Sequence, residues 1–128
     1  MPKITLLYAS LHALLLLALI APISRHRHRH GIGLGSGGDP LLARKIRVHA
    51  NFIEFVPIAL LMLALLELAG LQADWVWAFG GLLLLARLMH AIGLSRHAGY
   101  SFGRFWGTVL TMLVLLAMAI AGLWLSLR

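Results

Sequence analysis

The chain of 128 residues contains no cysteine and only four acidic side chains. Without cysteine, disulfide bonds, thiol catalysis by the protein itself and cysteine-ligated metal sites are excluded, and the redox compartment stays open. Charged residues make up 12% of the chain and hydrophobic residues 61%, whereas a soluble domain carries roughly 25% charged residues. The shortage of charge indicates that lipid surrounds most of the surface. A chain of this length is expected to form a single domain, residues 1–128.

The basic residues are unevenly distributed along a chain whose net charge is +7 and whose isoelectric point is near 11.5. Such a balance can indicate a nucleic-acid partner. However, six of the eleven basic residues lie between two apolar stretches: Arg25, Arg27, Arg29, Arg44, Lys45 and Arg47. A membrane protein keeps such a block on its cytoplasmic side, next to anionic lipid head groups. We therefore expect a lipid bilayer as partner and no nucleic acid.

Four apolar stretches indicate membrane-spanning helices at about residues 4–23, 41–70, 74–94 and 104–127. Each is near the ~20 residues that cross a bilayer as a helix, and the apolar character is continuous instead of forming one stripe. The first run resembles a signal peptide, but it exceeds the usual apolar core of ~7–15 residues and lacks a small-x-small cleavage site. The sequence thus predicts an all-α integral membrane four-helix bundle.

The charge of the connecting segments predicts the orientation of the helices. The first connection is strongly basic, and the third, around residues 95–104, adds Arg96 and Arg104. The second connection, residues 71–74, has one acid and no basic residue. By the positive-inside rule, the first and third connections face the cytoplasm, and both termini lie on the other side.

The first connection has two parts. In residues 25–30 arginine alternates with histidine. Three histidines can bind a metal, but the interleaved arginines repel a dication, so we expect a positively charged membrane anchor and no metal site. The glycine-rich residues 31–38 follow, and Asp39-Pro40 then has the pattern of an N-cap with proline at the first helical position. The second helix is therefore expected to begin near Pro40.

Polar side chains inside the second and third helices form the candidate site, because charge inside a membrane is costly and usually functional. At ~100° per residue, Arg47, Asn51 and Glu54 fall within roughly 60° of one another on one helix face. Arg87 and His90 share a face of the third helix in the same way. Glu54 lies ~10 Å deeper than Arg47, and Arg87 reaches a similar depth from the same membrane surface. These positions predict a buried ion pair between Glu54 and Arg87.

Two interpretations fit these polar residues. In the first, they only lock the second and third helices together, by an ion pair and an interhelical hydrogen bond. This leaves Arg47, His90 and Arg104 at the same level without a further acid to balance them. Surplus positive charge in a water-accessible membrane pocket suits an anionic ligand. A ligand site is therefore the favoured interpretation, and the structural one is the alternative.

Other polar residues receive structural interpretations. His12 lies on an apolar helix and is expected to be a satisfied interior histidine. Glu67 and Asp74 lie near the outer ends of the second and third helices, where solvated interface charges are expected. Gly103 and Gly107 are expected to allow a close approach of the fourth helix to a neighbouring helix.

Residues 47–57, Arg-Val-His-Ala-Asn-Phe-Ile-Glu-Phe-Val-Pro, resemble the second-helix signature of the MAPEG proteins (membrane-associated proteins in eicosanoid and glutathione metabolism). Residues 37–42 and 87–93 resemble the bacterial branch in particular, and the likeness covers nearly the whole chain. The resemblance implies a homotrimer of four-helix subunits in the bacterial inner membrane. It also implies that glutathione, as co-substrate, binds between subunits near the cytoplasmic face, at positions matching Arg47, Asn51, Glu54, Arg87 and His90.

The resemblance also implies an activity. Arg104 matches the family's arginine at the start of the fourth helix, which stabilises the glutathione thiolate and is the implied catalytic residue. The implied reaction is that of a glutathione-dependent transferase or peroxidase acting on hydrophobic electrophiles. Catalytic members commonly carry a tyrosine where this chain has Leu94, and some carry a small polar residue where it has Phe105. A non-catalytic protein that binds a lipid or other amphiphile in the same pocket is therefore the alternative.

A third possibility is a small multidrug-type transporter, because those proteins also have four helices and a membrane carboxylate. Their essential acid lies in the first helix, where the apolar run of this chain contains a single histidine, His12, and no acid. The sequence thus disfavours transport.

Overall fold

In the computed structural model the chain forms four long α-helices: α1 spans Lys3–His30, α2 Pro40–Leu68, α3 Ala73–Arg96 and α4 Phe102–Ser126. The structure describes the backbone of residues 1–96 and 101–128 and the side chains of residues 1–93 and 101–128. All four helices are long and apolar enough to cross a membrane, and no strand occurs in the described backbone. The expected all-α membrane four-helix bundle is confirmed.

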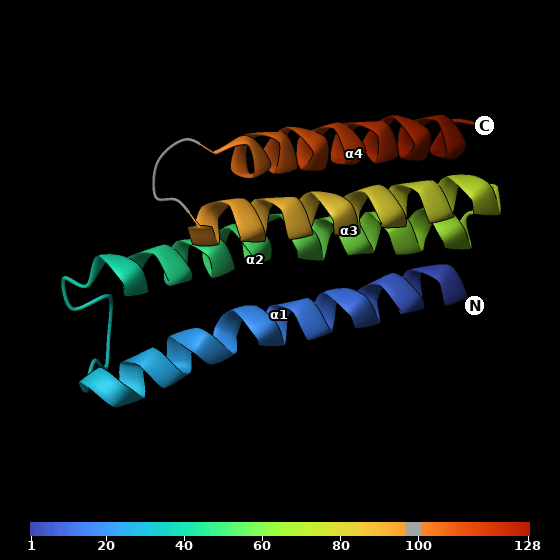
Figure 1. Ribbon diagram of the computed structural model, residues 1–128. Coiled ribbons are helices and arrows are strands. Elements are labelled where there is room, and N and C mark those ends of the chain that lie inside the picture. The colour runs from blue at the N-terminus through green and yellow to red at the C-terminus, as the bar shows by residue number, and fades with distance from the viewer. Residues whose placement is uncertain (97–100) are drawn as a thin grey trace.

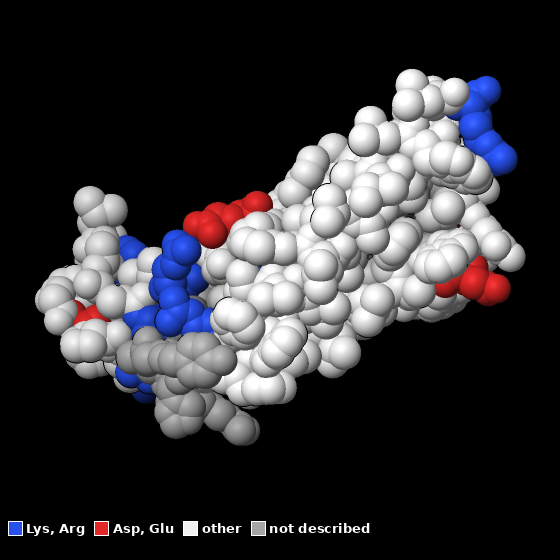
Figure 2. All heavy atoms as spheres, turned by 90° about the horizontal axis from the view of Figure 1, so that it is seen from above, with Lys and Arg blue, Asp and Glu red and all other residues white. Residues whose placement is uncertain are grey.

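Consecutive helices run antiparallel, so both chain termini lie at one end of the bundle (Figure 1). α2 and α3 form the centre, and each contacts the other three helices. α1 and α4 flank them and do not contact each other within the described residues. The end opposite to the termini, which carries residues 31–39 and the start of α4, is called the basic end. Most of the Lys and Arg side chains in Figure 2 gather there, next to a broad uncharged surface.

α1 is longer than the sequence predicts. The apolar run ends near residue 23, but the helix continues through the arginines and histidines to His30. It ends where Gly31 adopts a left-handed backbone conformation, with a φ of 63°, which glycine reaches without steric cost. Pro22 lies inside the helix and does not end it. The sequence predicts that the basic residues 25–30 belong to a loop. This prediction is wrong, because they form the last part of α1.

α2 begins as the sequence predicts. Asp39 is its N-cap, and its Oδ1 accepts hydrogen bonds from the amides of Leu41 at 2.8 Å and Leu42 at 3.1 Å. His26 of α1 donates a hydrogen bond from Nε2 to the other carboxylate oxygen at 2.6 Å. The His26 bond, followed by those from the α2 amides, lowers the pKa of Asp39 below its ordinary value of 3.8. One carboxylate thus joins the start of α2 to α1.

The interior is apolar toward the termini and polar toward the basic end. The apolar part contains buried side chains from all four helices, among them Tyr8, Leu63, Leu83 and Met118. Gly80 of α3 leaves room for the Tyr8 ring, because a Cβ atom at this position would overlap with the ring. This packing fixes the helices relative to one another, and the candidate site lies beyond it, toward the basic end.

α3 and α4 meet backbone to backbone. A Cβ atom on Gly103 would lie 2.7 Å from the carbonyl oxygen of Met89, and one on Gly107 would lie 2.7 Å from the amide nitrogen of His90. Such distances are shorter than van der Waals contact, so the two glycines permit the close approach that the sequence predicts. The contact also fixes His90 against the first turns of α4.

Glu67 of α2 caps the N-terminus of α1. Its carboxylate accepts hydrogen bonds from the amides of Ile4 at 3.0 Å and Thr5 at 2.7 Å, in the first turn of α1. A helix N-terminus carries unpaired amides and partial positive charge, so an anion is stabilising there. Glu67 thus lies at the outer end of α2 as expected, and it also has a capping role that the sequence did not predict. Asp74, in the first turn of α3, is exposed as expected.

His12 is buried on α1, as the sequence predicts. Its Nδ1 donates a hydrogen bond to the carbonyl of Tyr8 at 2.7 Å, and its ring lies 6.1 Å from that of Phe52. Its Nε2, however, has no hydrogen-bond partner among the described residues. The histidine is thus interior but only half satisfied.

Candidate functional site

Arg87 lies at the centre of the polar part of the bundle. It is only 1% exposed, and no carboxylate in the described structure forms an ion pair with it. Its Nη2 donates a hydrogen bond to Asn51 Oδ1 at 2.7 Å, and its Nη1 donates to Thr111 Oγ1 at 3.4 Å. One guanidinium group therefore links α2, α3 and α4.

Two features help to accommodate this buried cation. The rings of Phe52 and Phe55 lie 5.8 Å and 6.0 Å from Arg87 Cζ, within range of cation–π attraction. Thr111 donates its own hydroxyl hydrogen to the Gly107 carbonyl at 2.7 Å, which leaves its oxygen free to accept from Arg87. The cation is thus held by neutral groups and aromatic faces.

The expected Glu54–Arg87 ion pair is not formed. Glu54 Oε1 instead accepts a hydrogen bond from Arg47 Nη1 at 3.1 Å, from two turns earlier on the same helix. Asn51 takes the position that faces Arg87. The ~60° that separates Glu54 from Asn51 around the helix axis is enough to turn one side chain outward and the other inward. Glu54 therefore acts on Arg87 only as a nearby charge.

The Arg47–Glu54 pair stands on the outer surface of α2, where the two side chains are 57% and 47% exposed. Lipid chains are a costly environment for such charges, so this face needs water, a ligand or another protein surface against it. The exposed side chains of Ile58, Leu61 and Leu65 continue from Glu54 toward the other end of the helix. Their spacing of four, three and four residues forms one stripe. α2 thus presents a continuous outward face that is charged at one end.

His90 and Arg104 complete the cluster. His90 is 2% exposed, and its Nδ1 has no hydrogen-bond partner in the described part of the chain. Arg87, Arg104 and Arg47 are all close enough to act on it electrostatically. Arg104 also lines a surface groove of about 440 Å³ along α4, together with Phe105. Positive charge from three helices therefore surrounds one histidine, as the surplus of cations in the sequence suggests.

The six site residues predicted from the sequence differ in how deeply the structure buries them. The buried ones are Asn51, Arg87 and His90; the more exposed ones are Arg47, Glu54 and Arg104. Thr111 also belongs to the cluster but was not predicted, and the only signal for it is a hydroxyl on apolar α4, one turn after Gly107. The side chain of Leu94, where catalytic relatives commonly carry a tyrosine, lies outside the described residues.

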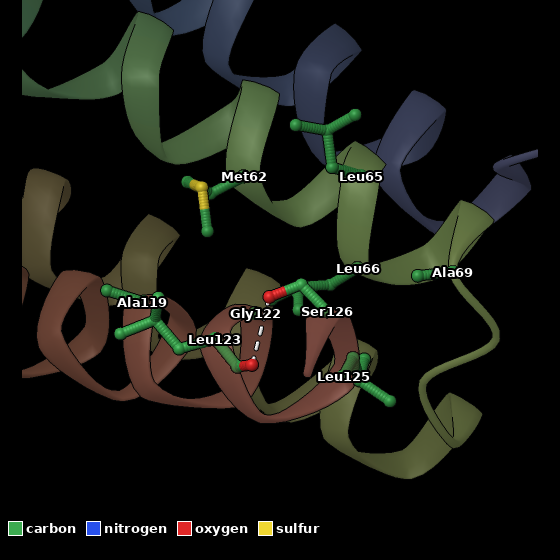
Figure 3. Close-up of a pocket in the computed structure, with 9 residues that line it drawn as sticks. All are labelled: Met62, Leu65, Leu66, Ala69, Ala119, Gly122, Leu123, Leu125 and Ser126. Carbon is green, nitrogen blue, oxygen red and sulfur yellow. Dashed lines mark hydrogen bonds between the residues drawn. The ribbon is translucent and has the colours of Figure 1, made fainter. Parts of the chain in front are cut away.

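A separate apolar groove of about 610 Å³ lies between α2 and α4, near the chain termini (Figure 3). Met62, Leu66 and Leu123 are among its lining residues. Ser126 Oγ, also in the lining, donates its hydrogen to the Leu123 carbonyl at 2.9 Å. Along α2, Met62 lies roughly 12 Å beyond Glu54. The groove therefore suits an apolar molecule and is distinct from the polar cluster.

The polar cluster supplies positive charge and hydrogen-bond donors but no metal-ligand set. Among the described residues, no group of three or more His, Cys, Asp or Glu side chains has an arrangement that could hold a metal ion. Arg47 and Arg104 carry guanidinium groups that suit a carboxylate or a thiolate, and Glu54 suits an ammonium group. Groups of both signs at one place can bind a ligand that carries both positive and negative charge.

These features define a multi-pass membrane protein whose four-helix bundle holds a cationic polar site near one end. The model of the MAPEG family matches residues 5–124, so the chain belongs to this family. The chain is similar to the inner membrane protein YecN of Escherichia coli K12 and to the protein of the same name from Escherichia coli O6:H1 strain CFT073. Each is 36% identical over 121 residues, which cover 94% of this chain and 91% of the relative. The helices and these relatives together support a multi-pass integral inner membrane protein.

Proposed function

We propose that the chain binds glutathione at Arg47, Glu54 and Arg104 and uses it as co-substrate in a transferase or peroxidase reaction on hydrophobic electrophiles. The observation that carries this proposal is the exposed Arg47–Glu54 pair on a membrane-spanning helix, with Arg104 adding positive charge nearby. Glutathione carries two carboxylates, one ammonium group and one thiol, which suit these partners. Membership in the MAPEG family, which has glutathione-related members, supports the same function.

Each charged group has a distinct role in this proposal. Arg47 binds a carboxylate of the tripeptide, and Glu54 accepts hydrogen bonds from its ammonium group. Arg104 lies beside the sulfur, where a cation lowers the pKa of a thiol and raises the reactive thiolate fraction at neutral pH. The buried Asn51, Arg87 and His90 complete the binding site behind these groups and hold α2 and α3 in position.

Two reactions follow from a stabilised thiolate. In a transfer reaction, the sulfur bonds to the electrophilic carbon, the leaving group departs with the bonding electrons, and the thiol proton passes to solvent. In a peroxidase reaction, two glutathione molecules are oxidised to their disulfide while a lipid hydroperoxide is reduced to an alcohol and water. The hydrophobic substrate reaches the site from the bilayer in both cases.

The proposed site also involves other copies of the chain. We infer that the outward face of α2 packs against α2 of neighbouring subunits in a homotrimer, because this removes the exposed charges from lipid. Residues on one helix stripe suit such packing. In a Leu61→Cys variant, oxidation should cross-link subunits, because Leu61 lies on the stripe. Leu113→Cys, an equally exposed position on α4, is the matched control and should stay monomeric on denaturing gels.

A calorimetric glutathione titration of the purified protein tests the binding site. Each of Arg47→Gln, Glu54→Gln and Arg104→Gln should weaken binding roughly 10- to 150-fold, the range for one hydrogen bond to a charged group. Arg128→Gln is the control, because Arg128 stacks on Trp124 near the chain terminus, far from the cluster. Unchanged affinity in all three site variants would rule out the proposed site.

The alternative is a non-catalytic membrane protein that binds a lipid or other amphiphile. The apolar groove between α2 and α4 favours it, because its walls are almost entirely apolar and it lies away from the polar cluster. This alternative requires saturable amphiphile binding that does not respond to thiol-blocking reagents. Conjugation of chlorodinitrobenzene or reduction of a lipid hydroperoxide by the purified protein would decide for the enzyme.

A further inference from the structure

Two adjoining hollows lie between α1 and α2 at the basic end. The first, of about 180 Å³, is lined by Ala18, Leu19, Pro22, Leu41, Arg44, Lys45 and Val48. The second, of about 150 Å³, is lined by Pro22, Arg25, His26, Arg29, His30 and Lys45. Because they share Pro22 and Lys45, they form one groove that is largely apolar on one side and basic on the other. This is called the α1–α2 groove below.

The continuation of α1 beyond the apolar run sorts its basic residues by face. Arg25 and Arg29 are four residues apart, so they share one face of the helix, and both line the groove. Arg27 lies about 160° away around the helix axis. Its Nη1 donates a hydrogen bond to the Gly33 carbonyl at 3.0 Å instead. The Arg-His alternation therefore directs two of its three arginines into the groove.

Lys45 of α2 is held in the groove by a chain of hydrogen bonds. Its Nζ donates to His26 Nδ1 at 3.3 Å, and His26 Nε2 donates to Asp39 at 2.6 Å. An ammonium group can only donate, so in this arrangement His26 Nδ1 accepts from Lys45 and Nε2 donates to Asp39. The ammonium keeps further N–H donors for a ligand.

The cations of the groove outnumber the carboxylates near them, because only Asp39 reaches the groove, through His26. Of the four acids in the chain, Asp39 is bonded to His26 and Glu54 to Arg47, Glu67 caps α1, and Asp74 lies at the other end of the bundle. A second copy of the chain would therefore bring positive charge, and no free acid, to this surface. The Nε of Arg44, in the wall of the apolar hollow, is also buried without a partner in the described structure. A basic wall beside an apolar wall suits an anion with an apolar part.

We propose that the α1–α2 groove binds one anionic phospholipid per subunit. Its phosphate is held by Arg25, Arg29 and Lys45, and the first part of an acyl chain lies in the hollow beside Leu19 and Leu41. Basic pockets between membrane helices are a general solution for binding such head groups. The site shares no residue with the proposed glutathione site, so either proposal can fail without the other.

Titration of the detergent-purified full-length protein with short-chain phosphatidylglycerol, phosphatidylcholine and inorganic phosphate tests this site, with native mass spectrometry as the readout. Phosphatidylglycerol should bind saturably, one molecule per subunit, while phosphatidylcholine and phosphate should bind far more weakly. Arg29→Gln should weaken phosphatidylglycerol binding about fivefold, because one basic residue near a membrane surface contributes about a factor of five. Arg27→Gln is the matched control: it removes the same charge two residues away and should leave the affinity unchanged.

A second variant separates the groove from general charge. Ala18→Trp places a large ring in the apolar hollow and should abolish phospholipid binding without removing any charge. Helical content and subunit mass, measured on each variant, show that the fold is kept. Equal losses for Arg27→Gln and Arg29→Gln would mean a diffuse basic surface and would overturn the proposal. Full phosphatidylglycerol affinity in Ala18→Trp, or phosphate binding as tightly as the lipid, would overturn it as well.

Discussion

Replacement of Gly107 by alanine should loosen the contact that joins α3 to α4. The new Cβ atom would lie 2.7 Å from both the Ala86 carbonyl oxygen and the His90 amide nitrogen, and 2.9 Å from His90 Cα. All three atoms belong to the backbone, so no side chain can rotate away. Because ordinary van der Waals contact begins near 3.4 Å, the helices must separate by about 0.7 Å at this point.

The loss of unfolding free energy caused by Gly107→Ala follows from the rigidity of the contact between α3 and α4. Overpacking of a well-packed interior typically destabilises a protein by about 1–3 kcal/mol. The Gly107 position should fall in the upper half of that range, because two helix backbones have to move together. The same movement shifts His90 away from the first turns of α4, so the relative positions of the cluster residues change as well.

The assay is reversible unfolding of the purified protein in mixed micelles. Gly107→Ala should lower the free energy of unfolding by about 2–3 kcal/mol. Gly122→Ala is the matched control on the same helix, because its Cβ would meet only the ends of flexible side chains, Met62 Cε at 3.2 Å and Leu66 Cδ2 at 3.8 Å. Its effect should stay within about 0.5 kcal/mol. If Gly107→Ala were as stable as the wild type, or if both variants lost equal stability, the reasoning would be refuted.

Three further predictions concern other parts of the fold. Glu67→Ala should lower the free energy of unfolding by about 1 kcal/mol, the usual value of a helix cap, because two amides of α1 lose their acceptor; a neutral effect would contradict the capping role. Because the pKa of Asp39 is lowered in the folded protein, its stabilising effect is complete above the ordinary value of 3.8 and is lost as the pH falls through the lowered pKa. Melting temperatures between neutral and acid pH should therefore fall more steeply for the wild type than for Asp39→Asn, and parallel curves would contradict this. In the cysteine-free chain, an impermeant maleimide should label Lys3→Cys, and not Gly35→Cys, from the periplasmic side, whereas the reverse pattern would invert the proposed topology.

Local features of the fold could be read from the sequence, and features that depend on helix rotation could not. The start of α2 is local, because the Asp39 carboxylate and the two amides it binds lie within three residues. The end of α1 was misplaced, because hydropathy marks the part of a helix in lipid while arginine and histidine continue the helix into water. α1 ends at Gly31, which has a left-handed backbone conformation. The φ angle of a glycine cannot be predicted from the sequence alone.

In the candidate site, too, local spacing could be read from the sequence and the rotation of the helices could not. Composition and helical spacing predicted that polar residues of α2 and α3 come together, and Arg87 does bind Asn51 in the structure. The pairing was wrong because a helical wheel does not say which of Asn51 and Glu54 faces inward, and the shorter amide takes the place beside Arg87. The bond between Glu67 and the first turn of α1 joins residues more than sixty positions apart. No local pattern in the sequence indicates such a contact.

The central claim is that the cluster around Arg104 binds glutathione and ionises its thiol. The most direct test is the ultraviolet absorbance of the thiolate, recorded as the purified protein is titrated with glutathione at neutral pH. A free thiol with a pKa of about 8.5 is mostly protonated under these conditions. The account predicts a saturable thiolate band with the wild type that is lost in Arg104→Gln and retained in Arg128→Gln. The absence of any thiolate band when the wild-type protein is saturated with glutathione would contradict it.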